Sequence, residues 1–151
     1  MVVEPLIDVR LNVIVSPTDG TILSFGKIDL NKDPKPLTIK GHNFSISKLL
    51  LEPNQNPKHS RYAYLTIYLS PSDCHRIMSP ITGTIKSIQY IQGALYPVRD
   101  PYITNKKDLY NSNERTIVRL ENKKTELYCV AVAAINVSKI QCQFDSSLSK
   151  E

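Results

Sequence analysis

Apolar and polar residues alternate along much of this chain, and this pattern predicts β-strands rather than long helices. Residues 129–135 are apolar at every position, which is typical of a central strand buried on both faces. Ten prolines and only five glycines favour short extended segments separated by rigid turns. The candidate strands in this pattern are residues 9–15, 37–40, 61–69, 116–120 and 126–135.

A nine-residue pattern occurs twice, as S-P-T-D-G-T-I-L-S from Ser16 and as S-P-I-T-G-T-I-K-S from Ser79. Each copy has the proline and glycine of a turn, followed by residues that favour a strand, at 21–24 and at 84–90. Two equivalent turn-and-strand units predict a mainly β fold. We expect a pseudo-twofold β-sandwich or flattened barrel with one or two short helices.

One short helix is predicted between the candidate strands. Ser45 is placed to cap a helix that carries Ile46, Leu49 and Leu50. The helix must end before Pro53, because the residue that precedes a proline avoids the helical conformation.

Polar stretches predict the loops and the extent of the domain. Residues 52–60, which include His59, are expected to form an exposed loop, and residues 100–113 a long, mobile connection. A length of 151 residues suits a single domain, residues 1–151, with residues 141–151 as a polar tail.

The charge pattern narrows the classes of partner. The formal net charge is +5, but no run of five like charges occurs, and aromatic residues do not alternate with basic ones. The chain therefore lacks the marks of a nucleic-acid-binding protein. A basic surface of this kind is compatible with contact to anionic lipid head groups.

The cysteines indicate the compartment. Cys74, Cys129 and Cys142 are widely spaced and form no C-x-x-C pair, which favours free thiols over a disulfide framework or a metal site. The sequence has no signal-peptide pattern and no apolar run long enough for a transmembrane helix. We expect a protein on the cytoplasmic side of the membrane, soluble or peripherally bound.

Five segments of the chain carry recognisable motifs. They are V-S-P-T-D-G at 15–20, G-H-N-F-S-I-S-K-L-L at 41–50, Y-L-S-P-S-D-C-H-R at 68–76, N-E-R at 113–115 and A-I-N-V-S at 134–138. In this order they resemble the segments of phosphatidylserine decarboxylases. The Y-L-S-P-S-D-C-H-R and G-H-N-F-S strings are specific, and the order of all five makes chance agreement improbable. The resemblance extends over about residues 10–140.

This resemblance implies a membrane-associated enzyme of phospholipid biosynthesis that converts phosphatidylserine to phosphatidylethanolamine. Members of the family cut themselves between Gly and Ser of an L-G-S-T-like motif. The new terminal group, a pyruvoyl, forms a Schiff base with the substrate amine and accepts electrons as the carboxylate leaves. Phosphatidylserine, or an anionic membrane surface that contains it, is the implied partner.

The resemblance also assigns roles to individual residues. Asp19 matches the aspartate that orients the base of self-cleavage, and His75 matches the first histidine of H-R-x-H, which is associated with decarboxylation. Met78 stands where the family has the second histidine, and a thioether cannot act as that base. His42 and Asn43, in the G-H-N-F-S string, are candidates for the substrate side of the site.

A second departure concerns the pyruvoyl group, which this sequence does not encode. No glycine of the chain is followed by serine, so the bond that the family cleaves is missing from these residues. The family also continues for several strands beyond the A-I-N-V-S segment. We therefore expect a truncated, divided or degenerate member that is inactive alone. A C-terminal partner polypeptide or a homodimer would cover the exposed strand edges.

Two other classes of function compete with this interpretation. The first is a non-catalytic module that binds lipid or protein and retains only the fold. The second is a carrier or phosphotransfer domain, because S-P-x-x-G-T-I strand units also resemble those proteins. A carrier needs a lysine at a hairpin tip, which is not evident, and phosphotransfer would require His42 and His75 to meet.

Overall fold

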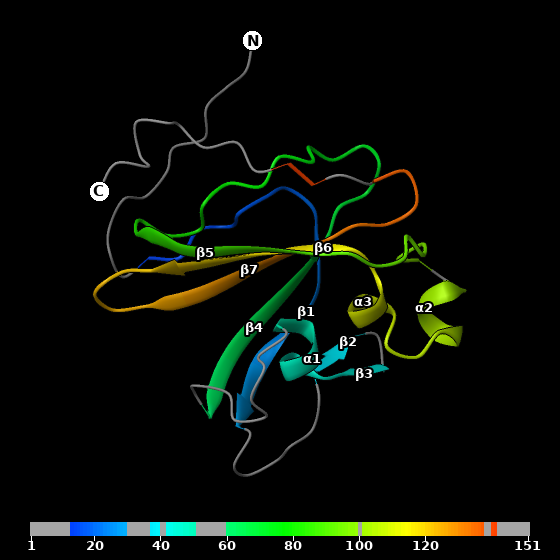
Figure 1. The fold of residues 1–151 in the computed structure, drawn as a ribbon, viewed down its shortest axis with the longest axis horizontal. Coiled ribbons are helices and arrows are strands. Elements are labelled where there is room, and N and C mark those ends of the chain that lie inside the picture. Colours follow the sequence, from blue (N-terminus) through cyan, green and yellow to red (C-terminus); the bar gives the residue numbers. More distant parts are fainter. Residues whose placement is uncertain are drawn as a thin grey trace.

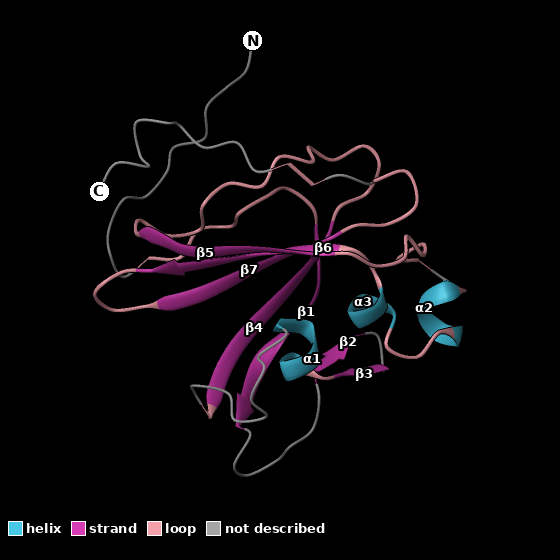
Figure 2. Cartoon of the chain, viewed as in Figure 1, coloured by secondary structure: helices cyan, strands magenta, loops and turns pink. Residues whose placement is uncertain are grey.

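The computed structural model describes residues 13–29, 37–39, 42–50, 60–99, 101–137 and 140–141. This part of the chain is mainly β, with three short helices, so the predicted fold class is confirmed (Figures 1 and 2). In chain order the elements are β1 Thr21–Asp29, β2 Leu37–Ile39, β3 His42–Phe44, α1 Ile46–Leu50, β4 Arg61–Tyr68, β5 Thr84–Ile91, α2 Tyr102–Asn105, α3 Leu109–Ser112, β6 Arg115–Glu121 and β7 Glu126–Val132.

All strand pairs among these elements are antiparallel. β1 pairs with β4, β2 pairs with β3, and β5, β6 and β7 form a three-stranded sheet in that order. The β1–β4 pair runs away from the three-stranded sheet, and the two meet near the start of β1 and the end of β4 (Figure 1). The described strands thus form open sheets rather than a closed barrel.

The repeated sequence pattern produces a repeated structure. Thr21 opens β1 opposite Tyr68 of β4, and Thr84 opens β5 opposite Glu121 of β6. The pairing register then shifts at the same point of each copy, between Ile22 and Ser24 in β1 and between Ile85 and Ser87 in β5. A β-bulge at equivalent positions in both copies supports the predicted pseudo-twofold relationship.

The glycine of each copy is required because a backbone carbonyl oxygen of the paired strand lies very close to it. A Cβ atom on Gly20 would lie 2.5 Å from the carbonyl oxygen of Tyr68, and one on Gly83 would lie 2.5 Å from that of Glu121. Tyr68 is the last residue of β4 and Glu121 is the last residue of β6, and each pairs with the first residue of the neighbouring strand. Only glycine allows the backbone to approach so closely there.

The core lies where α1 and α3 meet the sheets. Phe44, Leu109 and Tyr110 form its buried centre, and the rings of Phe44 and Tyr110 pack edge to face with centroids 4.8 Å apart. This geometry is favourable for two aromatic rings. Partly buried apolar side chains surround this centre: Leu23, Ile28, Ile46, Leu49, Tyr64, Val98 and Val132.

The predicted helix after Ser45 is confirmed. The backbone N–H of Lys48 donates to Ser45 Oγ at 3.3 Å, so the side chain of Ser45 satisfies one of the free N–H groups at the start of α1. The predicted strands at 37–40 and 61–69 are also present, as β2 and β4. No described helix has the length and apolar character that would allow it to cross a membrane.

Two strand predictions were wrong in detail. Residues 13–15 are not part of a strand, while residues 9–12 lie outside the described part of the chain. The apolar run 129–135 is not a central strand: β7 ends at Val132 and, among the described strands, pairs only with β6. All seven residues of β7 are half-buried, whereas a central strand covered on both faces would be fully buried.

The segment 100–113 was predicted to be a mobile polar connection, and this was wrong for its described residues. It contains α2 and α3, and its two aliphatic anchors, Ile103 and Leu109, are completely buried. Burial of each such side chain contributes about 1.5–3 kcal/mol of favourable transfer free energy. These anchors order a stretch that is polar on average.

Candidate functional site

The two copies of the repeat contact each other through reciprocal backbone hydrogen bonds. The N–H of Val15 donates to the carbonyl oxygen of Pro80 at 2.9 Å, and the N–H of Met78 donates to that of Pro17 at 2.7 Å. Val15 and Met78 occupy the same place in the two copies, as do Pro17 and Pro80. A twofold axis between the segments would generate such an exchange of donor and acceptor.

A further bond extends this contact toward the residues singled out in the sequence. Thr18 Oγ1 donates to the carbonyl oxygen of Cys74 at 3.3 Å. Thr18 directly precedes Asp19, and Cys74 directly precedes His75, so the two candidate catalytic residues belong to segments that are hydrogen-bonded to each other. Both residues are exposed. That their side chains meet, and that Met78 faces the same site, remain predictions.

The turn that carries His75 is fixed by Asp73. Asp73 Oδ2 accepts a hydrogen bond of 2.7 Å from the N–H of Ser70, and the N–H of Asp73 donates to the carbonyl oxygen of Ser70 at 3.0 Å. The backbone N–H of Ser70 is the main reason that the pKa of Asp73 is lowered. The hydroxyl of Ser70 and the nearby charge of His75 act in the same direction.

The orientation of the His75 ring follows from this turn. His75 Nδ1 lies 2.9 Å from the carbonyl oxygen of Asp73. A carbonyl oxygen can only accept, so Nδ1 carries a proton in this contact, and Nε2 of the neutral ring is left as the acceptor. Asp73 was not singled out from the sequence, although S-P-x-D is a recognisable turn pattern in which the aspartate bonds to the backbone.

Met78 and Ile77, which follow His75, have exposed apolar side chains. Met78 is 40 % exposed and Ile77 is 43 % exposed. Met78 has no group that exchanges a proton, so the described residues at this position offer packing but no base.

The N-E-R string, residues 113–115, is buried and holds backbone segments together. Asn113 is fully buried, and its side chain makes three hydrogen bonds to backbone groups: it accepts from the N–H of Tyr96 and donates to the carbonyl oxygens of Tyr96 and Ala133. Glu114 is 8 % exposed and accepts a hydrogen bond from the phenol of Tyr90, which is the main cause of the raised pKa of Tyr90. This string thus joins the loop after β5 to the sheet.

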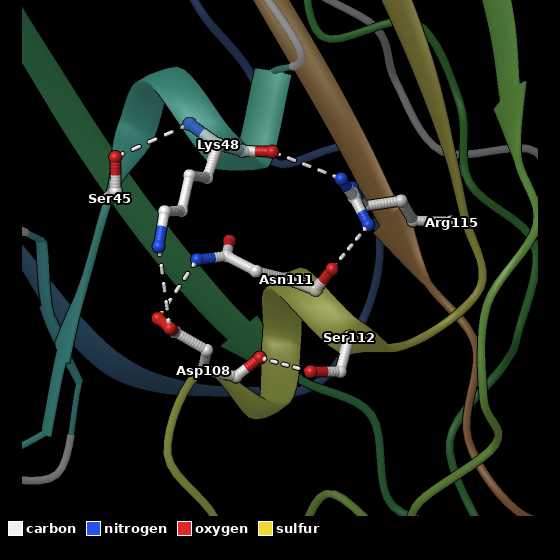
Figure 3. Close-up of polar contacts among 6 residues, drawn as sticks. All are labelled: Ser45, Lys48, Asp108, Asn111, Ser112 and Arg115. Carbon is white, nitrogen blue, oxygen red and sulfur yellow. Dashed lines mark hydrogen bonds and ion pairs between the residues drawn. The ribbon is translucent and has the colours of Figure 1, made fainter.

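Arg115 is the most connected of the buried polar residues. The residue is 2 % exposed, and its guanidinium donates to four carbonyl oxygens, those of Lys48 and Leu49 in α1 and those of Asn111 and Asn113 at the end of α3. Figure 3 shows the bonds to Lys48 and Asn111. Burial lowers its pKa, but a guanidinium remains charged at neutral pH. The carboxyl ends of two short helices are thereby held against β6.

A second set of contacts joins the same two helices at the surface. Lys48 Nζ lies 3.7 Å from Asp108 Oδ2, and Asn111 Nδ2 donates to Asp108 Oδ1 at 3.3 Å (Figure 3). The hydroxyl of Ser112 donates to the carbonyl oxygen of Asp108 at 2.9 Å. Asp108 has a φ of 56°, in the left-handed region that aspartate tolerates better than most residues.

His42 and Asn43 belong to a different part of the molecule from the Asp19 and His75 segments. They form strand β3 with Phe44, beside β2 and near α1. In Figure 1, β3 lies below the three-stranded sheet, whereas the loops that precede β1 and β5 run along its upper side. The described residues also contain no group of three or more His, Cys, Asp and Glu side chains placed to hold a metal ion.

The matching family model and the curated relatives agree on one protein family. A family model described as phosphatidylserine decarboxylase matches residues 5–151. A phosphatidylserine decarboxylase proenzyme of Campylobacter jejuni is 37 % identical over 136 residues, which cover 89 % of this chain and 51 % of that protein. The proenzyme of Myxococcus xanthus is 34 % identical over 139 residues, which cover 92 % of this chain and 49 % of that protein. The chain therefore spans about half the length of these curated relatives.

Proposed function

Because this chain belongs to the phosphatidylserine decarboxylase family, we propose that it supplies the Asp19 and His75 portion of a phosphatidylserine decarboxylase. The enzyme would convert phosphatidylserine to phosphatidylethanolamine, with the pyruvoyl-bearing segment lying outside these 151 residues. The substrate would be met at an anionic membrane surface, which suits a net charge of +5 and a peripheral protein on the cytoplasmic side.

The observation that carries this proposal is the contact between the two repeats. Reciprocal hydrogen bonds join Val15 to Pro80 and Met78 to Pro17, and Thr18 bonds to Cys74. These contacts tie the segment that bears Asp19 to the segment that bears His75, which is the grouping that the family's site requires.

The proposed role of His75 is to hold or release a proton beside the substrate carboxylate. Its Nδ1 is engaged by the carbonyl oxygen of Asp73, which leaves Nε2 of the exposed ring free to exchange a proton. Asp73 is then a positioning residue, since it sets the turn and the orientation of the imidazole.

The residues present do not fit formation of a pyruvoyl group. No Gly-Ser bond occurs in the sequence, and Met78 replaces the base that self-cleavage would need. Asp19 therefore lacks its family partner at this position, and no chemical step through a pyruvoyl group is assigned to these residues. His42 and Asn43 are kept as substrate-side candidates, for a part of the lipid away from the reacting carboxylate.

A partner segment is a necessary part of the proposal. The matched relatives are proenzymes about twice as long as the matched region, so the family holds enough additional chain to provide the missing motif. This segment would be joined to the present one or supplied as a second polypeptide. A homodimer would cover exposed surface but would add no Gly-Ser bond.

Co-expression tests the proposal. A bacterium depleted of its own phosphatidylserine decarboxylase would express this chain together with the part of the Campylobacter jejuni relative that follows the matched region. The ratio of phosphatidylethanolamine to phosphatidylserine in extracted lipid is the measurement. We expect the pair to restore phosphatidylethanolamine, His75→Ala to abolish it, and His59→Ala to leave it unchanged. Restoration by the His75→Ala pair, or none by a pair that is expressed and soluble, contradicts the proposal.

A further inference from the structure

Aromatic and basic side chains lie together at the end of the structure that carries α2 (Figure 1). The ammonium group of Lys106 lies over the ring of Tyr96, 3.9 Å from its centroid. The backbone N–H of Lys106 donates to the carbonyl oxygen of Tyr102, and the N–H of Tyr102 donates to that of Arg99. These contacts join the loop after β5 to α2 in one surface. We call it the α2 surface, and its residues are Leu95, Tyr96, Arg99, Tyr102, Lys106 and Lys107.

The aromatic side chains of the α2 surface are open to solvent, but the backbone beneath them is anchored. Tyr102 is 46 % exposed and Tyr96 is 37 % exposed. Ile103, which follows Tyr102, is completely buried. The side chain of Asn113 accepts from the N–H of Tyr96 and donates to its carbonyl oxygen. The surface is therefore formed before any partner binds, which lowers the ordering cost of an association.

The α2 surface is also positively charged. Residues 95–107 include three basic residues and one acidic residue, Asp100. Arg99 and Lys107 are exposed, and no acidic side chain in the described part of the chain forms an ion pair with either. Asp108, the next acidic residue along the chain, lies 3.7 Å from Lys48 of α1 and so has a basic partner of its own.

From these observations we propose that the α2 surface contacts an anionic lipid bilayer. Tyr96 and Tyr102 would lie among the lipid head groups, where a ring with an apolar body and a polar tip is favoured. Arg99 and Lys107 would lie against the lipid phosphates, because basic side chains are attracted to a negatively charged leaflet. This deepens the proposed function, since it rests on a lipid substrate and assigns the surface at which the chain meets the membrane.

The chemistry of the surface favours a bilayer over a second copy of the chain. Two α2 surfaces facing each other would bring like charges together, which is unfavourable. Exposure alone does not select this surface, because Phe25 in β1 is more exposed, at 76 %. The α2 surface differs in combining aromatic with basic side chains, and Lys106 over Tyr96 is the only cation–π contact among the described residues.

Tryptophan fluorescence gives a direct test, because the sequence contains no tryptophan. Tyr102→Trp places a probe on the α2 surface, and Phe25→Trp places a matched probe at an exposed aromatic position outside it. The complete chain would be mixed with vesicles of phosphatidylcholine alone, or with an equal share of either phosphatidylserine or phosphatidylglycerol added. Phosphatidylglycerol carries the negative charge without the serine group, so it separates contact with the surface from recognition of the substrate.

We expect the emission of the Tyr102→Trp variant to move to shorter wavelength with both anionic vesicles, and to be quenched by lipids brominated in their acyl chains. The emission of the Phe25→Trp variant should not change, and phosphatidylcholine alone should affect neither. Added salt should release the protein from the vesicles, because it screens exposed charges. Thermal unfolding checks that each variant is folded.

Charge substitutions give a second, independent measurement in the wild-type background. Arg99→Gln combined with Lys107→Gln should weaken binding to phosphatidylglycerol vesicles by about tenfold or more, since each basic residue near the surface contributes about fivefold. Lys27→Gln combined with Lys86→Gln removes the same charge at exposed positions in β1 and β5 and should have less than about a threefold effect. Equal weakening by the two pairs would mean that only the net charge of the chain matters.

Four results overturn the α2 surface as a membrane contact. They are no binding of the wild-type chain to anionic vesicles, binding to phosphatidylserine but not to phosphatidylglycerol, equal quenching in the Tyr102 and Phe25 variants, and equal weakening by the two charge pairs. If the co-expressed pair still restores phosphatidylethanolamine in any of these cases, the assigned surface is wrong while the proposed function stands. If the vesicle results are as expected and the pair restores nothing, the surface stands and the proposed function fails.

Discussion

The N–H of Met78 donates a hydrogen bond of 2.7 Å to the carbonyl oxygen of Pro17, two residues before Asp19. The residue that replaces the family's second histidine is thus joined through its backbone to the turn that carries the family's aspartate. This backbone bond does not depend on the side chain at residue 78, so a substitution there can change the side chain while the bond is kept.

The first prediction concerns self-processing. Purified protein should give a single intact chain of 17.1 kDa in mass spectrometry, because its residues include no Gly-Ser bond to cleave. A cut chain with a pyruvoyl terminus would contradict this. The Met78→His variant, kept at the same length, should also remain intact and serves as the control.

The same variant should behave differently when the missing bond is provided. If this chain is joined to a segment that carries an L-G-S-T motif, Met78→His should increase the rate of self-cleavage. A positioned base typically contributes about 10²–10⁴-fold. Equal cleavage of the wild-type fusion and the Met78→His fusion would show that the base comes from elsewhere.

The second prediction concerns Arg115. Replacement by Met keeps a side chain of similar length but removes the guanidinium. Four buried or partly buried carbonyl oxygens then lose their donor. We expect a loss of about 2–4 kcal/mol in the free energy of unfolding, measured with urea.

Arg119→Met is the matched control in the same strand. Arg119 pairs with Glu126 at 2.7 Å, at a site where both side chains retain some contact with solvent. Its loss should cost less than about 1 kcal/mol. Equal destabilisation by the two substitutions would mean that the bonds from Arg115 to α1 and α3 are not important for stability.

The third prediction uses the glycines of the repeat. In Gly83→Ala the new methyl group would meet the carbonyl oxygen of Glu121 at 2.5 Å, so the paired strands must separate. We expect a loss of about 1–3 kcal/mol in the free energy of unfolding. Gly20→Ala should cost at least as much, since Gly20 also has a φ of 133°. In Gly26→Ala the nearest atoms, 3.1 Å away, belong to the ring of Tyr64, and a smaller effect is expected.

The fourth prediction concerns pH and Asp73. The folded-state pKa of Asp73 lies below its ordinary value of 3.8, mainly because its carboxylate accepts the N–H of Ser70. A lowered pKa means that the charged form stabilises the fold. This contribution is complete above the unfolded-state pKa and is lost as the pH falls through the folded-state pKa.

Asp73→Asn should therefore reduce stability at pH 7, and the difference from wild type should shrink as the pH falls below the ordinary carboxyl pKa of 3.8. Urea unfolding at pH 7 and pH 3 measures this. A difference that stays constant between the two values would show that the carboxylate charge does not stabilise the turn.

The sequence predicted those features that depend on neighbouring residues. The Ser45 cap, the strand that became β4 and the repeated turns all follow from local patterns, and the repeat correctly predicted two equivalent turn-and-strand units. The family motifs predict Asp19 and His75 as catalytic residues, and these assignments stay predictions. Asp73 was overlooked, although its turn with Ser70 is equally local.

Features set by distant contacts were missed. Residues 100–113 are polar on average, but Ile103 and Leu109 are buried by segments far away in the sequence. The apolar run 129–135 resembles a central strand, yet the place of β7 at a sheet edge is decided by which strands lie next to it. The burial of Arg115 likewise depends on carbonyls of α1, more than sixty residues earlier.

We propose that this chain carries the Asp19 and His75 portion of a decarboxylation site. The most direct test of this proposal is release of carboxyl-labelled CO₂ from phosphatidylserine vesicles by purified chain mixed with a pyruvoyl-bearing polypeptide of the family. We predict CO₂ release by the wild-type mixture, a loss of at least about a hundredfold for His75→Ala, as expected for a general acid or base, and little change for the adjacent Cys74→Ser. Release that His75→Ala leaves intact, or no release from a mixture shown to form a complex, would contradict the claim.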